Sequence, residues 1–137
     1  GIESTVVDLT GKPKILRPGT ITKSKLNRFF KIDLSNNKSN IKSPGMLKKH
    51  YSPGIPVILN KKPKYSDHAY IVFGKKFENY KNYFNLSKKA DLKEAAANLY
   101  KTMRKIKKNG YKKIYVIKIP NKGLGVAIND RLKRASN

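Results

Sequence analysis

Residues that could hold a phosphate stand near the start of the chain. Ser4 and Thr5 open a run of β-branched and apolar residues over 4–9, and Arg17 closes a second run over 14–17. If these runs are paired strands, the hydroxyls and the guanidinium can face one end of a sheet, where α/β folds bind ligands. An arginine fork matches phosphate oxygens in pairs. We therefore take the three residues as candidate nucleotide contacts. The alternative from spacing alone is an ordinary hairpin with a solvated arginine.

A second group of candidate residues forms a turn followed by two ring side chains. Its members are Ser43, Pro44, Gly45, Met46, Lys49, His50 and Tyr51. Proline and glycine favour a tight turn, and Pro53 keeps the backbone that carries the rings stiff and extended. Such a segment could fold over a ligand and close it from water, as active-site lids do. The alternative is a linker held to its domain by one aromatic ring.

Three further polar motifs carry weaker signals. Gly123-Leu124-Gly125 resembles half of a dinucleotide-binding fingerprint, but the third glycine and the acidic residue after the next strand are missing. The Asn-Asp-Arg sequence at 129–131 is typical of a surface or of a contact between domains. His68 stands alone, and we read it as structural or exposed. With two histidines, no cysteine and no clustered carboxylates, we expect no metal site built by this chain alone.

The formal net charge of +24 raises a nucleic-acid function. Only five of the 32 basic residues are arginines, and lysine lacks the bidentate fork that readers of bases and phosphates use. The lysines are spread along the whole chain together with many Asn and Ile, as A+T-rich coding favours. We interpret the charge mainly as compositional drift and keep a basic RNA-binding module, or non-specific RNA binding, as the alternative.

Length and composition set further bounds. A chain of 137 residues can hold one compact domain plus a linker, but not two full cores. The absence of cysteine excludes disulfides and thiolate metal sites. No apolar run approaches the roughly 18–20 residues of a membrane span, and no signal peptide opens the sequence. We expect a soluble, cytoplasmic protein without membrane contact.

The first third of the chain predicts a hairpin and a linker. The runs at 4–9 and 14–17 are separated by a turn-like sequence and form the expected hairpin. Periodicity is then lost over 20–53, apart from a short helix expected within 20–30 with Thr22 as its cap. Segments of about thirty residues without regular structure are usually functional or disordered.

The rest of the chain alternates strands and helices. We expect strands at 56–59, 69–73, 82–86 and 113–119, and helices at 91–109 and 125–135. The first of these helices has an apolar face formed by Leu92, Ala95, Ala96, Leu99, Met103 and Ile106. Asp91 and Glu94 are spaced as a capping box, and Gly110 marks the end. The order of elements predicts a small α/β domain with a mostly parallel sheet.

Four motifs in order carry a resemblance to a known family. They are residues 1–9 (GIESTVVDL), 15–22 (ILRPGTIT), 43–53 (SPGMLKKHYSP) and 123–132 (GLGVAINDRL). This series resembles the two-domain form of threonylcarbamoyl-AMP synthase, a YrdC-type enzyme with an extra C-terminal domain. The resemblance implies that 1–19 are the last strands of a YrdC-like catalytic domain, 20–53 an interdomain linker and lid, and 54–137 an accessory Rossmann-like domain.

The resemblance also implies a reaction. Members of the family make L-threonylcarbamoyl-AMP from threonine, bicarbonate and ATP, releasing pyrophosphate, and a downstream transferase complex places the group on tRNA. Ser4 and Thr5 would then line the substrate pocket, Arg17 would contact the nucleotide phosphates, and Tyr51 would be the main contact of the linker. ATP, with Mg, would be held through the catalytic domain, in cis or in trans, and this chain alone would bind no cofactor.

Two departures from the family pattern bear on activity. Lys49 stands where family members often have arginine, which weakens a bidentate phosphate contact. The family's upstream lysine- and arginine-bearing motif and N-terminal sheet have no counterpart in these residues. We expect no catalytic residue here and no catalysis by this chain alone, whether it is part of a split gene, a decayed gene or an excised piece. We also expect residues 1–19 to be poorly ordered or misdocked without partner strands.

Overall fold

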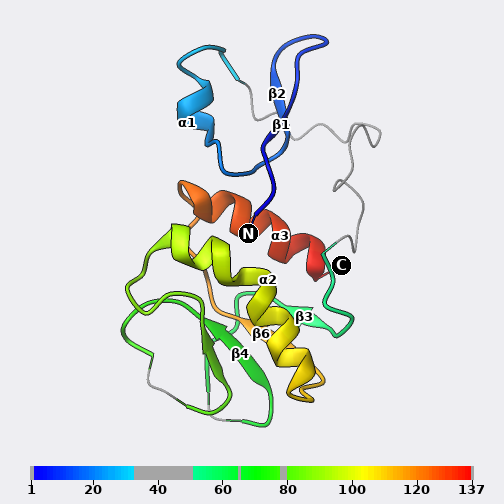
Figure 1. Ribbon diagram of the computed structural model, residues 1–137, viewed down its shortest axis with the longest axis vertical. Coiled ribbons are helices and arrows are strands. Elements are labelled where there is room, and N and C mark those ends of the chain that lie inside the picture. Colours follow the sequence, from blue (N-terminus) through cyan, green and yellow to red (C-terminus); the bar gives the residue numbers. More distant parts are fainter. Residues whose placement is uncertain (1, 33–50, 65, 78–79, 137) are drawn as a thin grey trace.

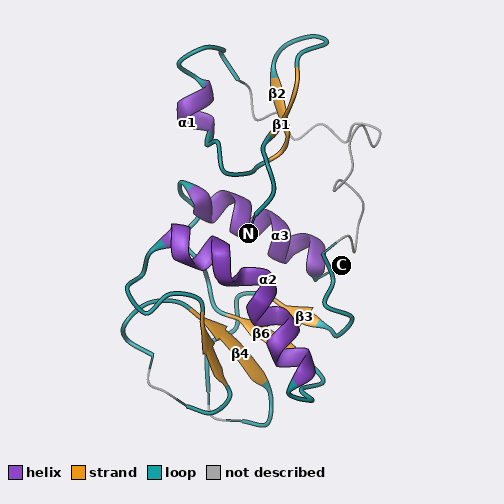
Figure 2. Cartoon of the chain, in the orientation of Figure 1, coloured by secondary structure: helices purple, strands orange, loops and turns teal. Residues whose placement is uncertain are grey.

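The computed structural model describes residues 2–32, 51–64, 66–77 and 80–136 (Figures 1 and 2). Within these residues an N-terminal hairpin lies at one end of the molecule and a parallel sheet at the other, with two long helices between them. The elements are β1 (Val6–Asp8), β2 (Lys14–Arg17), α1 (Lys23–Leu26), β3 (Val57–Ile58), β4 (Ala69–Val72), β5 (Tyr83–Asn85), α2 (Leu92–Lys108), β6 (Ile114–Val116) and α3 (Leu124–Ala135).

The hairpin expected from the first two runs is confirmed. β1 and β2 pair in antiparallel fashion, with Val6 opposite Arg17 and an irregularity after Val6. Asp8 closes the turn by accepting hydrogen bonds from both the N–H and the hydroxyl of Thr10. The expectation that residues 1–19 would be poorly placed is wrong, because Ile2 is buried and joins the main hydrophobic core. That anchor supplies the apolar contact that an isolated hairpin lacks.

The main sheet has the strand order β3-β6-β4-β5, and all three pairs are parallel. This confirms the predicted α/β class with a parallel sheet. α2 and α3 pack against each other and against one face of the sheet (Figure 1). Alternate residues of the central strands, Ala69 and Ile71 from β4 and Ile114 and Val116 from β6, enter the core with the apolar faces of both helices.

α2 begins as predicted, although its cap differs in detail. The Asp91 side chain accepts hydrogen bonds from the N–H groups of Lys93 and Glu94. The Glu94 carboxylate does not reach back to the N–H of Asp91; it accepts from the Ser87 hydroxyl, whose oxygen accepts from that N–H at 3.0 Å. Ser87 is therefore inserted into the capping box and ties the helix to the segment that follows β5.

The glycine motif before α3 has a packing reason. A Cβ at Gly125 would collide with the carbonyl oxygen of Pro120. Only glycine lets the first turn of α3 approach the preceding segment this closely. The short helix expected within 20–30 is also present as α1, with Thr22 at the N-cap position, but the Thr22 hydroxyl pairs with that of Ser24 at 3.3 Å and not with the helix backbone. No helix of the described residues is long and apolar enough to cross a membrane.

Candidate functional site

A buried arginine joins the start of the described chain to its final helix. Arg131, in α3, has no exposed side-chain surface, and its Nε donates to Glu3 Oε2 at 3.0 Å. Its Nη1 donates to Asp130 Oδ2 at 2.6 Å. A buried guanidinium is stabilised when carboxylates and hydrogen bonds compensate its lost hydration, and these two acids do so at Nε and Nη1. Residues 2–5 are therefore held against α3 by a specific ion pair.

Two tyrosine rings complete this cluster. The rings of Tyr51 and Tyr100 are stacked, with centroids 5.7 Å apart, and the guanidinium carbon of Arg131 lies 5.0 Å from the centre of the Tyr51 ring. The Tyr100 hydroxyl donates to Glu3 Oε2 at 3.1 Å. A cation over an aromatic face gains electrostatic attraction, most where water is excluded. We call Glu3, Tyr51, Tyr100, Asp130 and Arg131 the Glu3–Arg131 cluster.

The charges of the cluster shift one another's protonation. Burial by itself raises the pKa of Glu3, but a backbone hydrogen bond within the residue and the hydrogen bond and charge of Arg131 outweigh it, so this pKa lies below its ordinary value. Burial works to lower the pKa of Arg131, yet its hydrogen bond to Glu3 raises it overall. Burial, with the nearby charge of Glu3, raises the pKa of Tyr100. At neutral pH the cluster is thus an ion pair beside a neutral tyrosine.

A second arginine fixes the acid next to Arg131. Arg134 donates from Nε to Asp130 Oδ2 at 3.0 Å and from Nη2 to Oδ1 at 3.1 Å, a bidentate pair one turn along α3. Because Asp130 is clamped in this way, its Oδ2 is held where Arg131 Nη1 meets it. The sequence at 129–131 is compatible with a surface or with a contact between domains. In the structure its Arg131 is buried and contacts Glu3.

The predicted phosphate contacts lie together at the base of the hairpin. Arg17 Nε donates to the Ser4 carbonyl oxygen at 3.3 Å, and the Ser4 side chain is exposed. The Thr5 hydroxyl donates to the Ile21 carbonyl at 2.7 Å and accepts from the Ile21 N–H at 3.1 Å, which ties the hairpin to the segment before α1. A Cβ at Gly19 would collide with the backbone of residues 3–5, so a glycine is required there. Ser4 keeps its side chain towards solvent, whereas the Thr5 hydroxyl is committed to structure.

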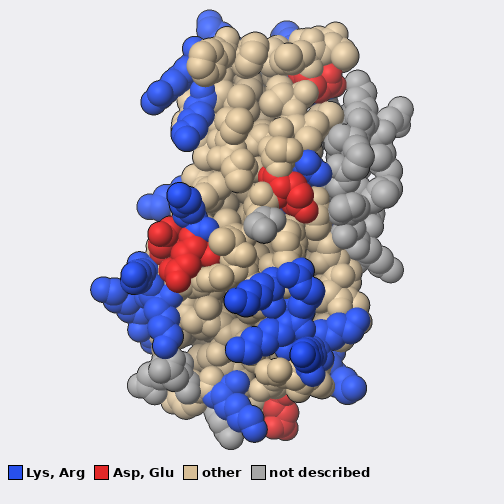
Figure 3. Space-filling model, in the orientation of Figure 1, with Lys and Arg blue, Asp and Glu red and all other residues tan. Residues whose placement is uncertain are grey.

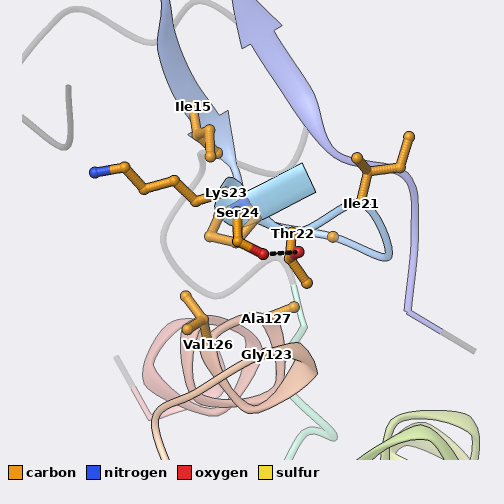
Figure 4. A pocket seen from close by; sticks show the side chains of 10 residues that line it. Ile15, Ile21, Thr22, Lys23, Ser24, Gly123, Val126 and Ala127 are labelled. Carbon is orange, nitrogen blue, oxygen red and sulfur yellow. Dashed lines mark hydrogen bonds between the residues drawn. The ribbon is translucent and has the colours of Figure 1, made fainter. Parts of the chain in front are cut away.

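A small cavity lies between this unit and α3. Its volume is about 230 Å³, and β2, the segment before α1 and the first turns of α3 form its walls (Figure 4). Ile15, Ile21, Val126 and Ala127 contribute apolar surface, and the Thr22 and Ser24 hydroxyls hydrogen-bond to each other at its edge. The cavity marks the joint between hairpin and helix and does not bring Arg17 into its wall.

The other predicted residues have different outcomes. Tyr51 is buried in the Glu3–Arg131 cluster, beside an open pocket of about 470 Å³ that also contacts Arg104 and Lys107. The remaining residues of the second group, Ser43, Pro44, Gly45, Met46, Lys49 and His50, lie outside the described residues. His68 is half-buried, with its ring edge-on to Tyr115 at 5.2 Å. Among the described residues, no three His, Asp or Glu side chains could together hold a metal ion.

Sequence reasoning missed the pairing of Glu3 with Arg131. One signal was available: Arg131 falls in line with Ala127, Ile128, Leu132 and Ala135 on the apolar face of the last helix. An arginine at such a position is buried and needs a carboxylate partner. Its partner lies 128 residues earlier, and periodicity carries no information about a contact of that range.

Residues 21–137 match a family model described as the C-terminal domain of threonylcarbamoyl-AMP synthase. The chain belongs to this family. Two curated threonylcarbamoyl-AMP synthases are similar to it. The Pyrococcus abyssi protein is 29% identical over 158 residues, covering 99% of this chain and 46% of that protein, and the Bacillus subtilis protein is 29% identical over 157 residues, covering 99% and 45%.

A solved structure of a threonylcarbamoyl-AMP synthase shares the fold. The crystal structure of P. abyssi Sua5 complexed with L-threonine gives a TM-score of 0.78 at 28% identity, over 99% of this chain and 46% of that chain. The chain spans about half the length of the curated threonylcarbamoyl-AMP synthases that it matches.

Proposed function

We propose that this chain is the C-terminal portion of a cytoplasmic enzyme that makes L-threonylcarbamoyl-AMP from threonine, bicarbonate and ATP, with release of pyrophosphate. The product would serve the threonylcarbamoyladenosine modification of tRNA through a downstream transferase complex. Membership of the threonylcarbamoyl-AMP synthase family supports this proposal, as does similarity to two such synthases over nearly the whole chain.

The ion pair between Glu3 and Arg131 is the observation that carries the proposed role. Glu3 directly precedes Ser4 and Thr5, and the pair fixes this segment to α3 of the accessory domain. A displacement of about 1 Å in a positioning group can cost a hundredfold in rate, so an accessory domain can act by holding substrate contacts in place. We infer that α3 positions the segment that carries Ser4 and Thr5 and takes no direct part in the chemistry.

The proposal assigns different roles to the predicted residues. Ser4 and Arg17 face the substrate, and the Arg17 guanidinium, whose fork matches phosphate oxygens, contacts the nucleotide phosphate. Thr5 acts through Ile21 and supports the wall. The lid role belongs to the second group of residues, with Tyr51 as the anchored end, since its ring is held by Arg131 and Tyr100.

Catalysis requires a YrdC-like domain, in cis or in trans, as the main holder of ATP with Mg and of threonine. Among the described residues, no three His, Asp or Glu side chains lie together as a site for Mg. The match covers only 46% and 45% of the two relatives, which leaves room in them for such a domain.

Pyrophosphate release tests the proposal. The purified chain should release no pyrophosphate from ATP with threonine and bicarbonate, and adding a separately produced YrdC-like domain should give release that stops when either bicarbonate or threonine is omitted. Release by the chain alone would overturn the dependence on the second domain. A YrdC-like domain that neither binds the chain in titration calorimetry nor responds to it in rate would overturn the positioning role. The coding DNA upstream of residue 1 would show whether the domain is supplied in cis.

A further inference from the structure

One face of the parallel sheet is covered by no helix of the described residues. α2 and α3 share one core with Ala69, Ile71, Ile114 and Val116, all on the same face. Side chains alternate along strands, so Tyr70, Tyr83 and Tyr115 point to the other face. Tyr70 is buried and yet lies outside that core. Tyr70 and Val72 are both buried, so the centre of this face, which parallel sheets normally cover with helices, is covered without one of the described helices.

Three tyrosines form a row across this second face. In the register of the sheet Tyr115 of β6 is opposite Tyr70 of β4, which is opposite Tyr83 of β5. The ring centroids are 5.1 Å apart for Tyr70 and Tyr115 and 5.9 Å apart for Tyr70 and Tyr83. Three more rings extend the row, and we call the six together the tyrosine face: His68, Tyr70, Phe77, Tyr80, Tyr83 and Tyr115.

The tyrosine face is accessible at its margin. Tyr80 packs edge-on against Tyr83 at 5.0 Å and keeps 44% of its surface exposed. Phe77, Tyr83, Tyr115 and His68 are half-buried, and Tyr70 lies beneath them. The rings therefore support one another while leaving surface for a ligand. Because the rings already hold one another in place, a ligand that binds them loses little free energy to the ordering of side chains.

Lysines surround the rings. Lys76 Nζ lies 5.3 Å from the centre of the Phe77 ring, and Lys113 Nζ lies 6.0 Å from that of Tyr115. In the described residues of the two segments beside the face, 59–64, 66–68, 74–77 and 80–82, there are six lysines and one acid, Asp67. The face is thus aromatic at its centre and positive at its rim, the complement of a polyanion that carries planar rings.

We propose that the tyrosine face binds single-stranded RNA, with bases against the exposed rings and phosphates near the surrounding lysines. Sheets that carry aromatic rings bind unpaired bases in this way, and stacking tolerates any sequence because every base has a π face. Lysine suits this role, since it contacts a backbone as a point charge and reads no base. The hairpin lies at the opposite end of the molecule (Figure 1), so RNA bound to the tyrosine face would not cover the proposed substrate contacts Ser4 and Arg17.

Basic side chains also gather elsewhere, and the test must separate them from the tyrosine face. Figure 3 shows Lys and Arg clustered over the region of α2. We therefore choose matched controls: Lys101, exposed on α2, for Lys76, and Phe29, 79% exposed beside α1, for Tyr80. Each control variant removes the same kind of group from a different surface.

The measurement is fluorescence anisotropy of a labelled oligouridylate of about 12 nucleotides, with the whole chain titrated at roughly 50 and 200 mM salt. Tyr80→Ala should weaken binding about tenfold, since one stacked base is lost. Tyr80→Phe should keep the affinity, and Phe29→Ala should leave it unchanged. Lys76→Ala should weaken binding more than Lys101→Ala. A hairpin duplex of the same length should compete poorly.

Several results would overturn the proposal. Equal losses for Lys76→Ala and Lys101→Ala would show binding by diffuse charge, and an unchanged affinity for Tyr80→Ala would exclude base stacking on this face. Equal competition by duplex would also contradict it. Absence of binding at the lower salt concentration would refute RNA binding by the tyrosine face. Circular dichroism melts of each variant separate loss of binding from loss of folding, and Tyr80→Phe retains a ring where a truncated variant is unstable.

Discussion

Arg131 donates to Glu3 across 128 residues of sequence and brings the residue before Ser4 into contact with α3. The pair is asymmetric: the arginine side chain is fully buried, while that of Glu3 keeps 38% of its surface exposed. Removing the carboxylate would leave a buried cation with Asp130 as its remaining charged partner among the described residues, whereas removing the arginine would leave a carboxylate that water can still reach. Much of the attachment of the hairpin base to α3 thus depends on the partly exposed side chain of Glu3.

Neutralising Glu3 should destabilise the chain. Glu3→Gln removes the partner of a buried guanidinium, and we expect a loss of about 1–2 kcal/mol in the free energy of unfolding, since hydrogen bonds to charged groups contribute at this level. Urea denaturation followed by circular dichroism measures it. Asp67→Asn, an equal charge change at an exposed position, should stay within about 0.5 kcal/mol. Similar losses of stability in Glu3→Gln and Asp67→Asn would show that the effect comes from net charge and not from the ion pair.

The contribution of Glu3 should depend on pH with a definite sign. Its pKa lies below the ordinary value of 4.5, so the folded state favours the ionised form. The stabilisation is therefore complete above the unfolded pKa and is lost as pH falls through the lower folded pKa. The difference in melting temperature between the unchanged chain and Glu3→Gln should be constant near neutrality and shrink below about pH 4.5. A difference that persisted at lower pH would assign it to packing.

Two glycines should respond differently to an added methyl group. Gly125→Ala gains up to about 1 kcal/mol in helix propensity but drives a Cβ into the Pro120 carbonyl, a backbone group that must move. Overpacking of this kind costs about 1–3 kcal/mol, so we expect a net loss. Gly11→Ala meets nothing within 4 Å and should change stability by less than about 0.5 kcal/mol. Thermal melts compare the two, and an unaffected Gly125→Ala would contradict the packing role.

Arg17 should matter for the proposed reaction in a way that charge alone does not explain. With a YrdC-like domain present, Arg17→Lys keeps the charge but loses the fork, and we expect kcat/KM for ATP to fall about tenfold. Arg28→Lys, at an exposed position after α1, is the matched control and should have no effect. Rates that are equal in both variants would remove Arg17 from the phosphate contacts.

Local patterns predicted most of the elements. The hairpin, α2 with Asp91 at its cap, and the parallel sheet all follow from periods of two or 3.6 residues and from turn residues, which neighbouring positions determine. Ser87 entered the cap of α2 unforeseen, because it lies outside the four-residue spacing of a capping box. The burial of Tyr51 agrees with the alternative given for its segment, a linker held to its domain by one aromatic ring.

Contacts between distant elements could not be predicted in the same way. The row of Tyr115, Tyr70 and Tyr83 exists because β6 lies between β3 and β4, and periodicity does not give strand order. The docking of Ile2 and Glu3 on the core has the same cause, and for that reason the expectation for residues 1–19 was wrong. The lid role of residues 43–50 stays a prediction.

The position of β6 has a consequence for the order in which the chain can fold during synthesis. β3 pairs with no strand of the described sheet except β6, which leaves the ribosome more than fifty residues later. The hairpin base waits longer still, because Arg131 is made after every strand. Until then Ile2 and the edges of β3 and β4 are exposed to other chains, a state prone to aggregation. A ribosome that pauses before α3 would hold the protein in that state.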